Sequence, residues 1–482
     1  MKIEPDSKRN KVREIIAKQK GTQYIEENLI DTNVNESEIR KGIPDDYGVV
    51  YTADGLGLLK APFDLQGDYK VKEGVIAIAD KAFYNCNKLI SIYLPESLRC
   101  IGKEAFFLCS SLSFVEIPSL VKKIPFGVFS SCSQLNSVNL PIGLLEIEDG
   151  AFHWCHSLSD IKFPTTLRKI GSFSFAECSS INKVILPEGV SQLGKYAFYK
   201  CNTLVEVAIK GKIQEIPQES FSECINLKRV EICGETKKIG YASFSKCKTL
   251  TDVKLPDSLE KIDVSTFSGC SSLKNINLPH SLEYIEEGAF NGCSSLKKLV
   301  LPVKLKSISQ AFIECNAELS IEGNNFTFKD GLIWNNGTLK LIACLTDNPL
   351  IEIPDKIKEI GFYAFGKRRN LKVVKIPESV EIIDCSAFSE SENLQCFYLP
   401  SKGLRQIKLN AFHNCDKLEI FALPSTIERV NMSAFEGCKN LSRIYILSEY
   451  ISVYKKLRDP KIKKLFSLIP NWTTYIKELD AK

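Results

Sequence analysis

One short phrase returns along the whole chain, in which alanine and phenylalanine precede a cysteine that follows the phenylalanine by three residues. Nine successive phenylalanine-to-phenylalanine intervals are 23 residues, the next is 22, and the last three are 23, 24 and 23. One wider gap of 53 residues separates Phe312 from Phe365 and corresponds to one repeat plus a 30-residue insertion. The repeat phenylalanines are Phe83, Phe106, Phe129, Phe152, Phe175, Phe198, Phe221, Phe244, Phe267, Phe290, Phe312, Phe365, Phe388, Phe412 and Phe435.

A period of 20 to 29 residues is typical of a leucine-rich solenoid. Each copy reads Leu-x-x-Ile-x-Leu-Pro, then two aliphatic residues three apart, then Ala-Phe-x-x-Cys. The Ile-x-Leu step has the period of a β-strand, and the proline ends the strand because it has no amide hydrogen. The pattern therefore predicts a repeat solenoid that is mainly β, a right-handed leucine-rich repeat superhelix of coils of about 23 residues. The aliphatic pair predicts a second extended piece, and Ala-Phe-x-x-Cys predicts a short helical or 3₁₀ turn.

These repeats resemble the BspA-type leucine-rich repeat family, whose phrase is nearly intact in IGKEAFFLCSSLSFVEIP at residues 101–118. The resemblance covers roughly residues 49–447. Arg368 and Ser391 depart from it at the cysteine position, and the copy at Phe312 is shortened. The resemblance implies a surface or secreted protein that adheres to other proteins, including those of a host or of the extracellular matrix, or that mediates cell contact.

Two segments with Asp-Gly, at residues 51–62 and 328–344, predict β-hairpins that each lead into a new run of coils. No stretch of about 18 apolar residues predicts a membrane span, and no secretory signal is recognisable. Location at the cell surface is therefore an expectation from the resemblance alone. The predicted organisation is a polar segment or cap at 1–48 with an amphipathic helix near 11–20, eleven copies at 49–322, an inserted hairpin at 323–352, four copies at 353–447 and a C-terminal cap at 448–482.

Thirteen of the 18 cysteines occupy the same place in the repeat. Stacked coils place equivalent side chains in parallel rows, which suits packing beside the phenylalanines better than disulfide formation. Metal binding is not expected, because no C-x-x-C pair occurs and the HWCH cluster at 153–156 includes a cysteine of the buried row. The predicted structural core is represented by Phe106, Phe221, Phe267, Phe290, Cys109, Cys270 and Cys293.

The sequence offers no pattern for catalysis. Its four histidines have no neighbouring nucleophile pattern, and glycine-rich phosphate loops and metalloprotease motifs are missing. We therefore expect neither an enzyme nor a cofactor. A net charge of +5 over 482 residues is also too small to favour nucleic acid as a partner.

The variable positions of Leu-x-x-Ile-x-Leu-Pro predict an exposed sheet face that recognises a protein partner, with lysines attracting acidic groups and aromatic residues anchoring the contact. A solvated lysine-rich face without a ligand is the simpler interpretation, and a structural spacer or self-assembling unit is the alternative function. The candidate binding residues are Lys183, Lys228, Arg229, Lys254, Lys274, Lys297, Lys298, Lys372, Lys375, Tyr93, Phe114, Tyr398 and Tyr445.

Overall fold

The computed structural model describes residues 30–308, 310–315, 317–431, 433–447, 466–469, 476–477 and 479–480. The helix predicted near residues 11–20 and most of the predicted C-terminal cap lie outside these residues. The chain forms two compact units, Met1–Leu259 and Glu260–Lys482, and each is described by itself. None of the helices that the structure describes is long and apolar enough to cross a membrane.

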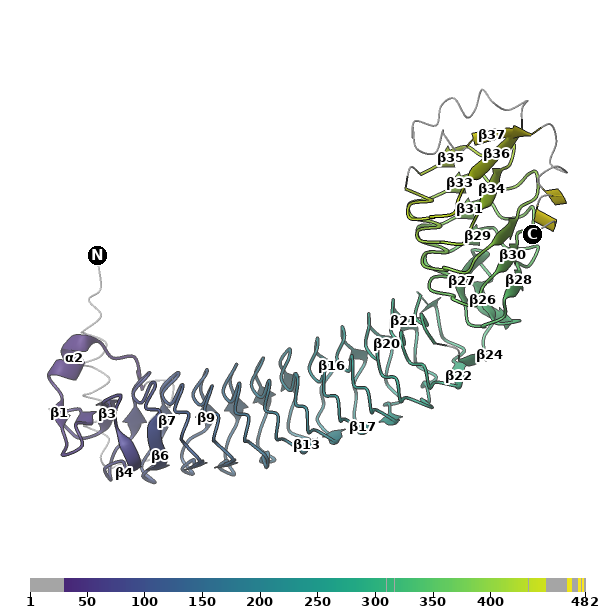
Figure 1. The fold of residues 1–482 in the computed structure, drawn as a ribbon. Coiled ribbons are helices and arrows are strands. Elements are labelled where there is room, and N and C mark those ends of the chain that lie inside the picture. Colours follow the sequence, from purple (N-terminus) through teal and green to yellow (C-terminus); the bar gives the residue numbers. More distant parts are fainter. Residues whose placement is uncertain are drawn as a thin grey trace, which may run out of the picture. The chain divides into compact units, whose positions relative to one another are not determined.

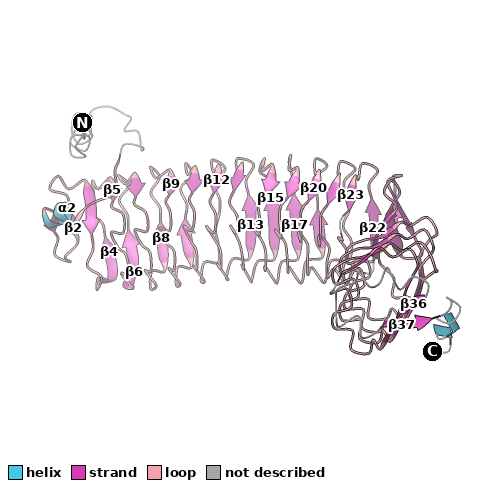
Figure 2. Ribbon diagram, turned by 90° about the horizontal axis from the view of Figure 1, so that it is seen from above, coloured by secondary structure: helices cyan, strands magenta, loops and turns pink. Residues whose placement is uncertain are grey.

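The N-terminal unit is a stack of coils, most of which have one longer and one shorter strand (Figures 1 and 2). In the coil of Asp160 the longer strand is reduced to an isolated bridge with Ser137. It opens with helix α2 (Glu36–Arg40) and strands β1 (Ile43–Pro44), β2 (Val50–Tyr51) and β3 (Gly57–Lys60). The longer strands are β4 (Gln66–Lys70), β6 (Lys88–Tyr93), β8 (Phe114–Glu116), β10 (Ser137–Asn139), β13 (Lys183–Leu186), β15 (Glu206–Ile209), β17 (Arg229–Ile232) and β19 (Asp252–Lys254). The shorter strands are β5 (Ala77–Ile78), β7 (Cys100–Ile101), β9 (Lys123–Ile124), β11 (Glu146–Ile147), β12 (Lys169–Ile170), β14 (Gln192–Leu193), β16 (Glu215–Ile216) and β18 (Lys238–Ile239).

The C-terminal unit has the same coils on both sides of an inserted antiparallel segment. Its first coils contain β20 (Lys261–Ile262), β21 (Tyr284–Ile285), β22 (Lys298–Leu301), β23 (Ser307–Ile308) and β24 (Glu318–Ile321). The inserted strands are β25 (Phe326–Lys329), β26 (Leu332–Asn335) and β27 (Lys340–Cys344). The later coils contain β28 (Leu350–Glu352), β29 (Glu359–Ile360), β30 (Val373–Lys375), β31 (Ile382–Ile383), β32 (Cys396–Tyr398), β33 (Gln406–Ile407), β34 (Ile420–Leu423), β35 (Arg429–Val430), β36 (Arg443–Leu447) and β37 (Phe466–Ile469).

Strand register follows the repeat, so that residues 23 apart pair in parallel. Val184 pairs with Val207, and Glu146 pairs with Lys169. Both predicted extended pieces are therefore present as strands in most coils, but residues 273–279 form no strand and Asp160 forms only an isolated bridge. We call the sheets of longer strands the long-strand sheets, and those of two-residue strands the short-strand sheets.

The third side of each coil is the turn segment, which runs from three residues before the repeat phenylalanine to three after it, as at residues 80–86. The turn segments are not helical, because left-handed residues stand two before and two after the phenylalanine, such as Lys81 (φ 58°) and Asn85 (φ 61°). The N–H groups of Lys81, Phe83 and Asn85 all donate to carbonyl groups of the next coil. The turn segments thus form a ladder of their own in place of the predicted helical or 3₁₀ turn.

The interior contains a stack of phenylalanine rings. In the N-terminal unit, successive ring centroids from Phe83 to Phe244 lie 4.9–5.5 Å apart. This separation follows from the spacing of stacked strands, about 4.7–4.9 Å. The predicted core residues Phe106, Phe221, Phe267, Phe290, Cys109, Cys270 and Cys293 are all buried.

The repeat cysteines are hydrogen-bond donors as well as buried side chains. The thiol of Cys109 donates to the carbonyl oxygen of Phe83 in the preceding coil at 3.1 Å. Where Ser391 replaces the cysteine, its hydroxyl donates to the equivalent carbonyl oxygen of Phe365 at 2.6 Å. The sequence suggested that the cysteine recurs because a small apolar side chain fits there. The structure adds a hydrogen bond to the preceding coil as a second reason.

Each hairpin begins a run of coils by supplying a first layer. Leu58 of β3 pairs with Ile78, and the N–H of Ala61 donates to the carbonyl of Ala82 at 2.7 Å. In the inserted segment Leu341 pairs with Ile360, and the N–H of Cys344 donates to the carbonyl of Ala364 at 2.8 Å.

Candidate interaction surfaces

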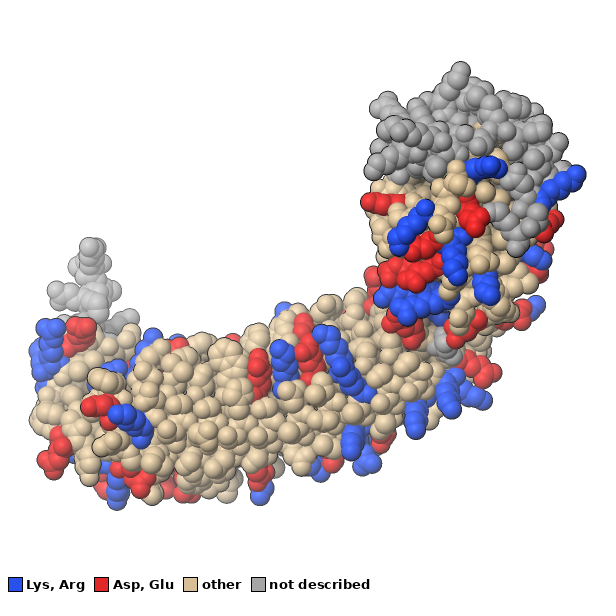
Figure 3. Space-filling model, in the orientation of Figure 1, with Lys and Arg blue, Asp and Glu red and all other residues tan. Residues whose placement is uncertain are grey.

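Most of the candidate basic residues on the long-strand sheets are already paired with acidic groups. Lys183 lies 3.1 Å from Glu206 one coil later, and Lys254 lies 2.8 Å from Glu231 one coil earlier. The other pairs are Arg229–Asp252 at 3.1 Å, Lys298–Glu318 at 3.8 Å and Lys375–Glu352 at 2.7 Å. On the face drawn in Figure 3, blue and red side chains lie next to one another, and much of the N-terminal unit is uncharged.

Four of the candidate lysines are exposed and form no ion pair within the described part of the chain, namely Lys228, Lys274, Lys297 and Lys372. Lys274 and Lys297 stand at equivalent positions of successive coils, since the N–H of Lys297 donates to the carbonyl of Lys274 at 3.4 Å. Two neighbouring ammonium groups form only a small basic spot, so these lysines do not make an extended basic surface.

The candidate aromatic residues divide into an exposed pair and a covered pair. Tyr93 is 57% exposed and Phe114 is 37% exposed. Tyr445, in contrast, is only 3% exposed and packs with Leu479 in a small apolar cluster. Tyr398 packs against the same cluster and donates its hydroxyl to Asp480 at 3.2 Å. The expectation that Tyr445 anchors a partner on an open face is therefore wrong, because a segment beyond the repeats covers it.

A second aromatic surface, which the sequence did not predict, lies on the turn segments of the N-terminal unit. The rings of Phe173 and Tyr196 stack at 4.6 Å, and Tyr199 meets Tyr196 edge to face at 5.8 Å. Next to them, Trp154 stacks on His153 at 4.2 Å, and His153 lies 6.1 Å from Phe173. We call these five residues the turn aromatic cluster. Trp154 and Phe173 are 43% and 41% exposed.

Three members of this cluster occupy left-handed backbone positions. Trp154 has φ 62°, Phe173 has φ 55° and Tyr196 has φ 58°. This conformation is unfavourable for bulky side chains, and glycine or asparagine adopts it most readily. Other coils do use those residues at the same positions, as in Gly127, Gly150, Gly269, Gly292, Asn410 and Asn414. Lys81, Glu104 and Leu108 also occupy these positions in other coils, so the left-handed conformation is a property of the repeat and not of the cluster.

An open cavity of about 560 Å³ in the N-terminal unit is lined in part by Phe126. Its other walls are acidic and basic side chains from neighbouring coils, including Asp80, Glu104, Asp149 and Lys169. Gly127 and Gly150, which follow Phe126 and Asp149, place no side chain on this part of the turn segments.

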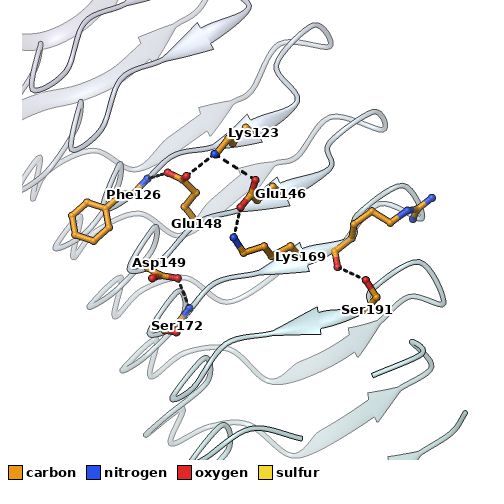
Figure 4. A network of polar contacts seen from close by, with 9 residues as sticks. Lys123, Phe126, Glu146, Glu148, Asp149, Lys169, Ser172 and Ser191 are labelled. Atoms are coloured by element: carbon orange, nitrogen blue, oxygen red, sulfur yellow. Dashed lines mark hydrogen bonds and ion pairs between the residues drawn. The ribbon is translucent and has the colours of Figure 1, made fainter. Parts of the chain in front are cut away.

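An ion-pair network supports the wall of the cavity (Figure 4). The ammonium of Lys123 lies 2.6 Å from Glu148 and 3.4 Å from Glu146, and Glu146 also lies 2.6 Å from Lys169. Burial opposes the ionisation of Glu146, but the ammonium groups of Lys169 and Lys123 outweigh it and hold its pKa below the usual value. Glu148 also accepts the N–H of Phe126 at 2.7 Å, and the Phe126 ring points away from the network.

The histidines do not form a reactive arrangement in the described residues. Burial lowers the pKa of His153, which stacks on Trp154, while the ring of His156 lies 3.0 Å from the carbonyl oxygen of Glu177. No hydrogen bond joins a histidine ring to a serine or cysteine side chain, and no group of three or more histidine, cysteine or acidic residues could hold a metal ion within those residues.

Parallel stacking at a 23-residue period, two sheets and a buried phenylalanine row define a leucine-rich repeat protein. The chain belongs to the BspA-type leucine-rich repeat family, whose model matches residues 67–153, 145–273, 226–340 and 344–457. Members of this class are repeat scaffolds that generally mediate protein interactions. A search of curated proteins gives no match to the chain.

One solved structure shares the fold, and two others are reported beside it as similar chains. A leucine-rich repeat protein from Bacteroides ovatus is 24% identical, covering 89% of this chain and 97% of that one with a TM-score of 0.51. A leucine-rich cell surface protein from Faecalibacterium prausnitzii is 22% identical, covering 90% and 96%, with a TM-score of 0.35. The pneumococcal vaccine antigen PcpA is 20% identical, covering 84% and 78%, with a TM-score of 0.38.

Proposed function

We propose that this protein is a non-enzymatic scaffold that binds another protein in adhesion or cell-surface interaction, and that the turn aromatic cluster is its recognition surface. The observation that carries this proposal is the exposure of Trp154 and Phe173 beside the rings of His153 and Tyr196 on which they stack. The left-handed backbone does not distinguish these positions, because other coils place Lys81, Glu104 and Leu108 there. Exposed aromatic side chains that cluster in this way are typical of interaction sites.

The chemistry of the cluster suits a protein partner. Tryptophan and tyrosine dominate the energetics of protein interfaces, because they bury a large area and lose little side-chain freedom. Here the rings also rest on one another, and the hydroxyl of Tyr196 is fixed by donation to Glu219 at 2.9 Å and acceptance from Gln218 at 2.7 Å. The partner that fits this surface presents an apolar patch with polar groups at its rim.

The lysines of the long-strand sheets are a weaker basis for recognition. Several are neutralised by an acidic neighbour one coil away, and exposed ion pairs of this kind contribute little energy. Tyr93 and Phe114 remain an alternative aromatic surface, and the experiment below separates the two.

The test is a double variant, Trp154→Asn with Phe173→Asn. Asn414 and Asn410 occupy the equivalent positions of another coil at φ 56° and φ 54°, so asparagine fits the backbone. We expect the free energy of unfolding to change by less than about 1 kcal/mol. Binding to an immobilised preparation of extracellular-matrix proteins should fall at least tenfold, which corresponds to about 1.4 kcal/mol.

The matched control is Tyr93→Ala with Phe114→Ala, which removes two exposed rings from the long-strand sheet. If this control loses binding and the asparagine variant keeps it, recognition belongs to the sheet face. If both variants bind like the original chain, the turn aromatic cluster is not the recognition surface. A chain that binds no matrix protein, and whose size in solution rises with concentration, would instead support the self-assembling alternative.

A further inference from the structure

The long-strand sheet of the C-terminal unit is interrupted at the insertion. β22 and β24 form a two-stranded sheet, and the next long strands form a separate sheet in the order β28-β30-β32. After Ile321 the chain turns away, and β25 pairs with β26 instead of continuing the stack on β24. β24 is therefore an edge strand, although an ordinary coil would have placed another parallel strand beside it.

The backbone groups at this edge have a definite orientation. The N–H groups of Glu318 and Glu322 donate to Lys297 and Leu301, so residues at even positions of β24 face β22. Since backbone groups alternate in direction along a strand, those of Leu319 and Ile321 face the open side. Neither residue forms a hydrogen bond with any other described part of the chain on that side.

A cavity of about 440 Å³ lies along this edge. It is lined by Leu319, Ser320 and Ile321 of β24 and by Phe326 and Phe328 of β25, among others. A cavity of this size falls within the range of natural ligand sites, about 300–1,000 Å³. β25 is itself the edge strand of the inserted sheet. Two edge strands, β24 and β25, therefore border the cavity.

The other end of the unit shows how the same kind of edge is filled. There β37 (Phe466–Ile469), which lies beyond the last repeat, pairs in parallel with β36, Tyr445 opposite Ser467. A strand from outside the repeat pattern thus completes one long-strand sheet. The edge of β24 has no such strand in the described residues.

We propose that the open edge of β24 binds an extended peptide segment of a partner protein as an added parallel strand. Main-chain hydrogen bonds to Leu319 and Ile321 supply affinity, and alternating side chains supply specificity, as in other cases of strand addition. Side chains facing the interior meet Leu319 and Phe326, which favours aliphatic residues. Side chains on the outer face meet Ser320 and the carboxylates of Glu318 and Glu322. Glu318 lies 3.8 Å from Lys298 and Glu322 lies 3.3 Å from the ring of His280, but both pairs are exposed and weak, so basic residues are still favoured there.

This site is separate from the turn aromatic cluster, and its test does not depend on the function proposed above. The probe is a fluorescein-labelled, acetylated hexapeptide of alternating valine and lysine, and its binding is measured by fluorescence anisotropy on the intact chain. Two further peptides carry N-methyl groups on the lysine amides or on the valine amides. In a parallel addition only the lysine N–H groups face β24, so methylation there should weaken binding at least about tenfold.

Methylation of the valine amides should leave binding within about threefold, because those groups face away from β24. The reverse result would support an antiparallel addition at the same edge. Equal effects of the two methylations, or no binding of the parent peptide, would overturn the proposal. Hydrogen exchange locates the bound peptide, since the amides of Leu319 and Ile321 should become protected when it binds.

Two variants complete the test. Ile321→Pro removes an N–H that faces the cavity and keeps those that face β22, so it should lose peptide binding with an unchanged circular dichroism spectrum. Glu318→Lys with Glu322→Lys leaves the backbone intact and should weaken the valine-lysine peptide while strengthening a valine-glutamate peptide. Binding that is indifferent to this charge reversal would contradict the predicted preference for basic side chains.

Discussion

Single residues of one coil have distinct physical tasks, although they recur together. The phenylalanine fills the interior and stacks on its counterparts, as Phe221 does between Phe198 at 5.3 Å and Phe244 at 5.4 Å. The residues on the outer face of the long strands contact mainly solvent and one neighbour. The free energy of unfolding should therefore depend strongly on the repeat phenylalanine and weakly on the residues of the outer face.

A pair of alanine substitutions tests this distinction. Phe221→Ala should lower the free energy of unfolding by about 3–5 kcal/mol, because it removes a fully buried ring between two others. Lys274→Ala should change it by less than about 0.5 kcal/mol, because Lys274 is exposed. Chemical denaturation of both variants provides the measurement. The opposite ranking would show that Phe221 lies on the surface and Lys274 in the interior.

The cysteine position should depend on its hydrogen bond. The thiol of Cys201 donates to the carbonyl oxygen of Phe175 at 3.2 Å, and burial raises the pKa of this thiol far above the usual value. Cys201→Ser keeps a donor, as Ser391 shows, whereas Cys201→Val has none. We expect the serine variant to be more stable than the valine variant by about 1 kcal/mol in urea unfolding. A more stable valine variant would mean that apolar filling alone governs this position.

At the scale of elements, most coils join two strands of unequal length through a turn segment with its own hydrogen-bonded ladder. Cross-coil ion pairs then link neighbouring elements. The most enclosed of them surrounds Asp384, whose carboxylate lies 2.8 Å from Lys340 of β27 and 2.9 Å from Lys408 after β33. Burial opposes the ionisation of Asp384, but these two ammonium groups outweigh it and hold its pKa well below the usual value.

This lowered pKa predicts the pH dependence of the C-terminal unit. A carboxylate whose folded pKa lies below its unfolded value stabilises the fold above the unfolded value, near 3.8, and loses that contribution as the pH falls toward the folded value. Asp384→Asn should therefore reduce stability at pH 7 and flatten the loss of stability below about pH 4. Urea unfolding at several pH values measures both effects. Glu352→Gln, in an exposed pair with Lys375, is the control and should alter the profile little.

The strands could be predicted from the sequence because a strong local pattern specifies them. β13 (Lys183–Leu186), for example, alternates buried and exposed residues and ends before Pro187. The turn segments were harder to predict, because their left-handed positions accept Lys81, Glu104 and Leu108 as readily as glycine. No residue type marks them, so the Ala-Phe-x-x-Cys phrase looked like a short helix.

The candidate site was predicted only in part. The exposure of Tyr93 and Phe114 follows from strand alternation, and the pairing of Lys183 with Glu206 could have been recognised from their separation of 23 residues. The burial of Tyr445 could not have been predicted from the repeat pattern, because Leu479, which packs against it, lies beyond the repeats. Trp154 and Phe173 were not among the predicted residues, because the recognition face was expected on the sheet; their signal in the sequence is an aromatic residue at a variable turn position.

At the scale of the whole molecule, coils contact mainly their neighbours in the stack, so stability is close to a sum over coils and their interfaces. A local lesion should accordingly have a local effect. Phe221→Ala should accelerate hydrogen exchange in the turn segments around Phe198 and Phe221, and leave the coils from Phe365 to Phe435 unchanged. Mass-spectrometric exchange on the intact chain measures this. Equal acceleration in both regions would show that the chain unfolds as one cooperative body.

The ladder of the turn segments also gives each array a polarity. Its backbone-to-backbone N–H donors, such as those of Lys81, Phe83 and Asn85, point toward the following coil, so their peptide dipoles add along the stack as they do along a helix. The leading end of an array therefore presents carbonyl oxygens, which accept the N–H of Ala61 in one hairpin and of Cys344 in the other. Two stacks of this kind are therefore complementary head to tail, whereas joining their leading ends would set carbonyl against carbonyl.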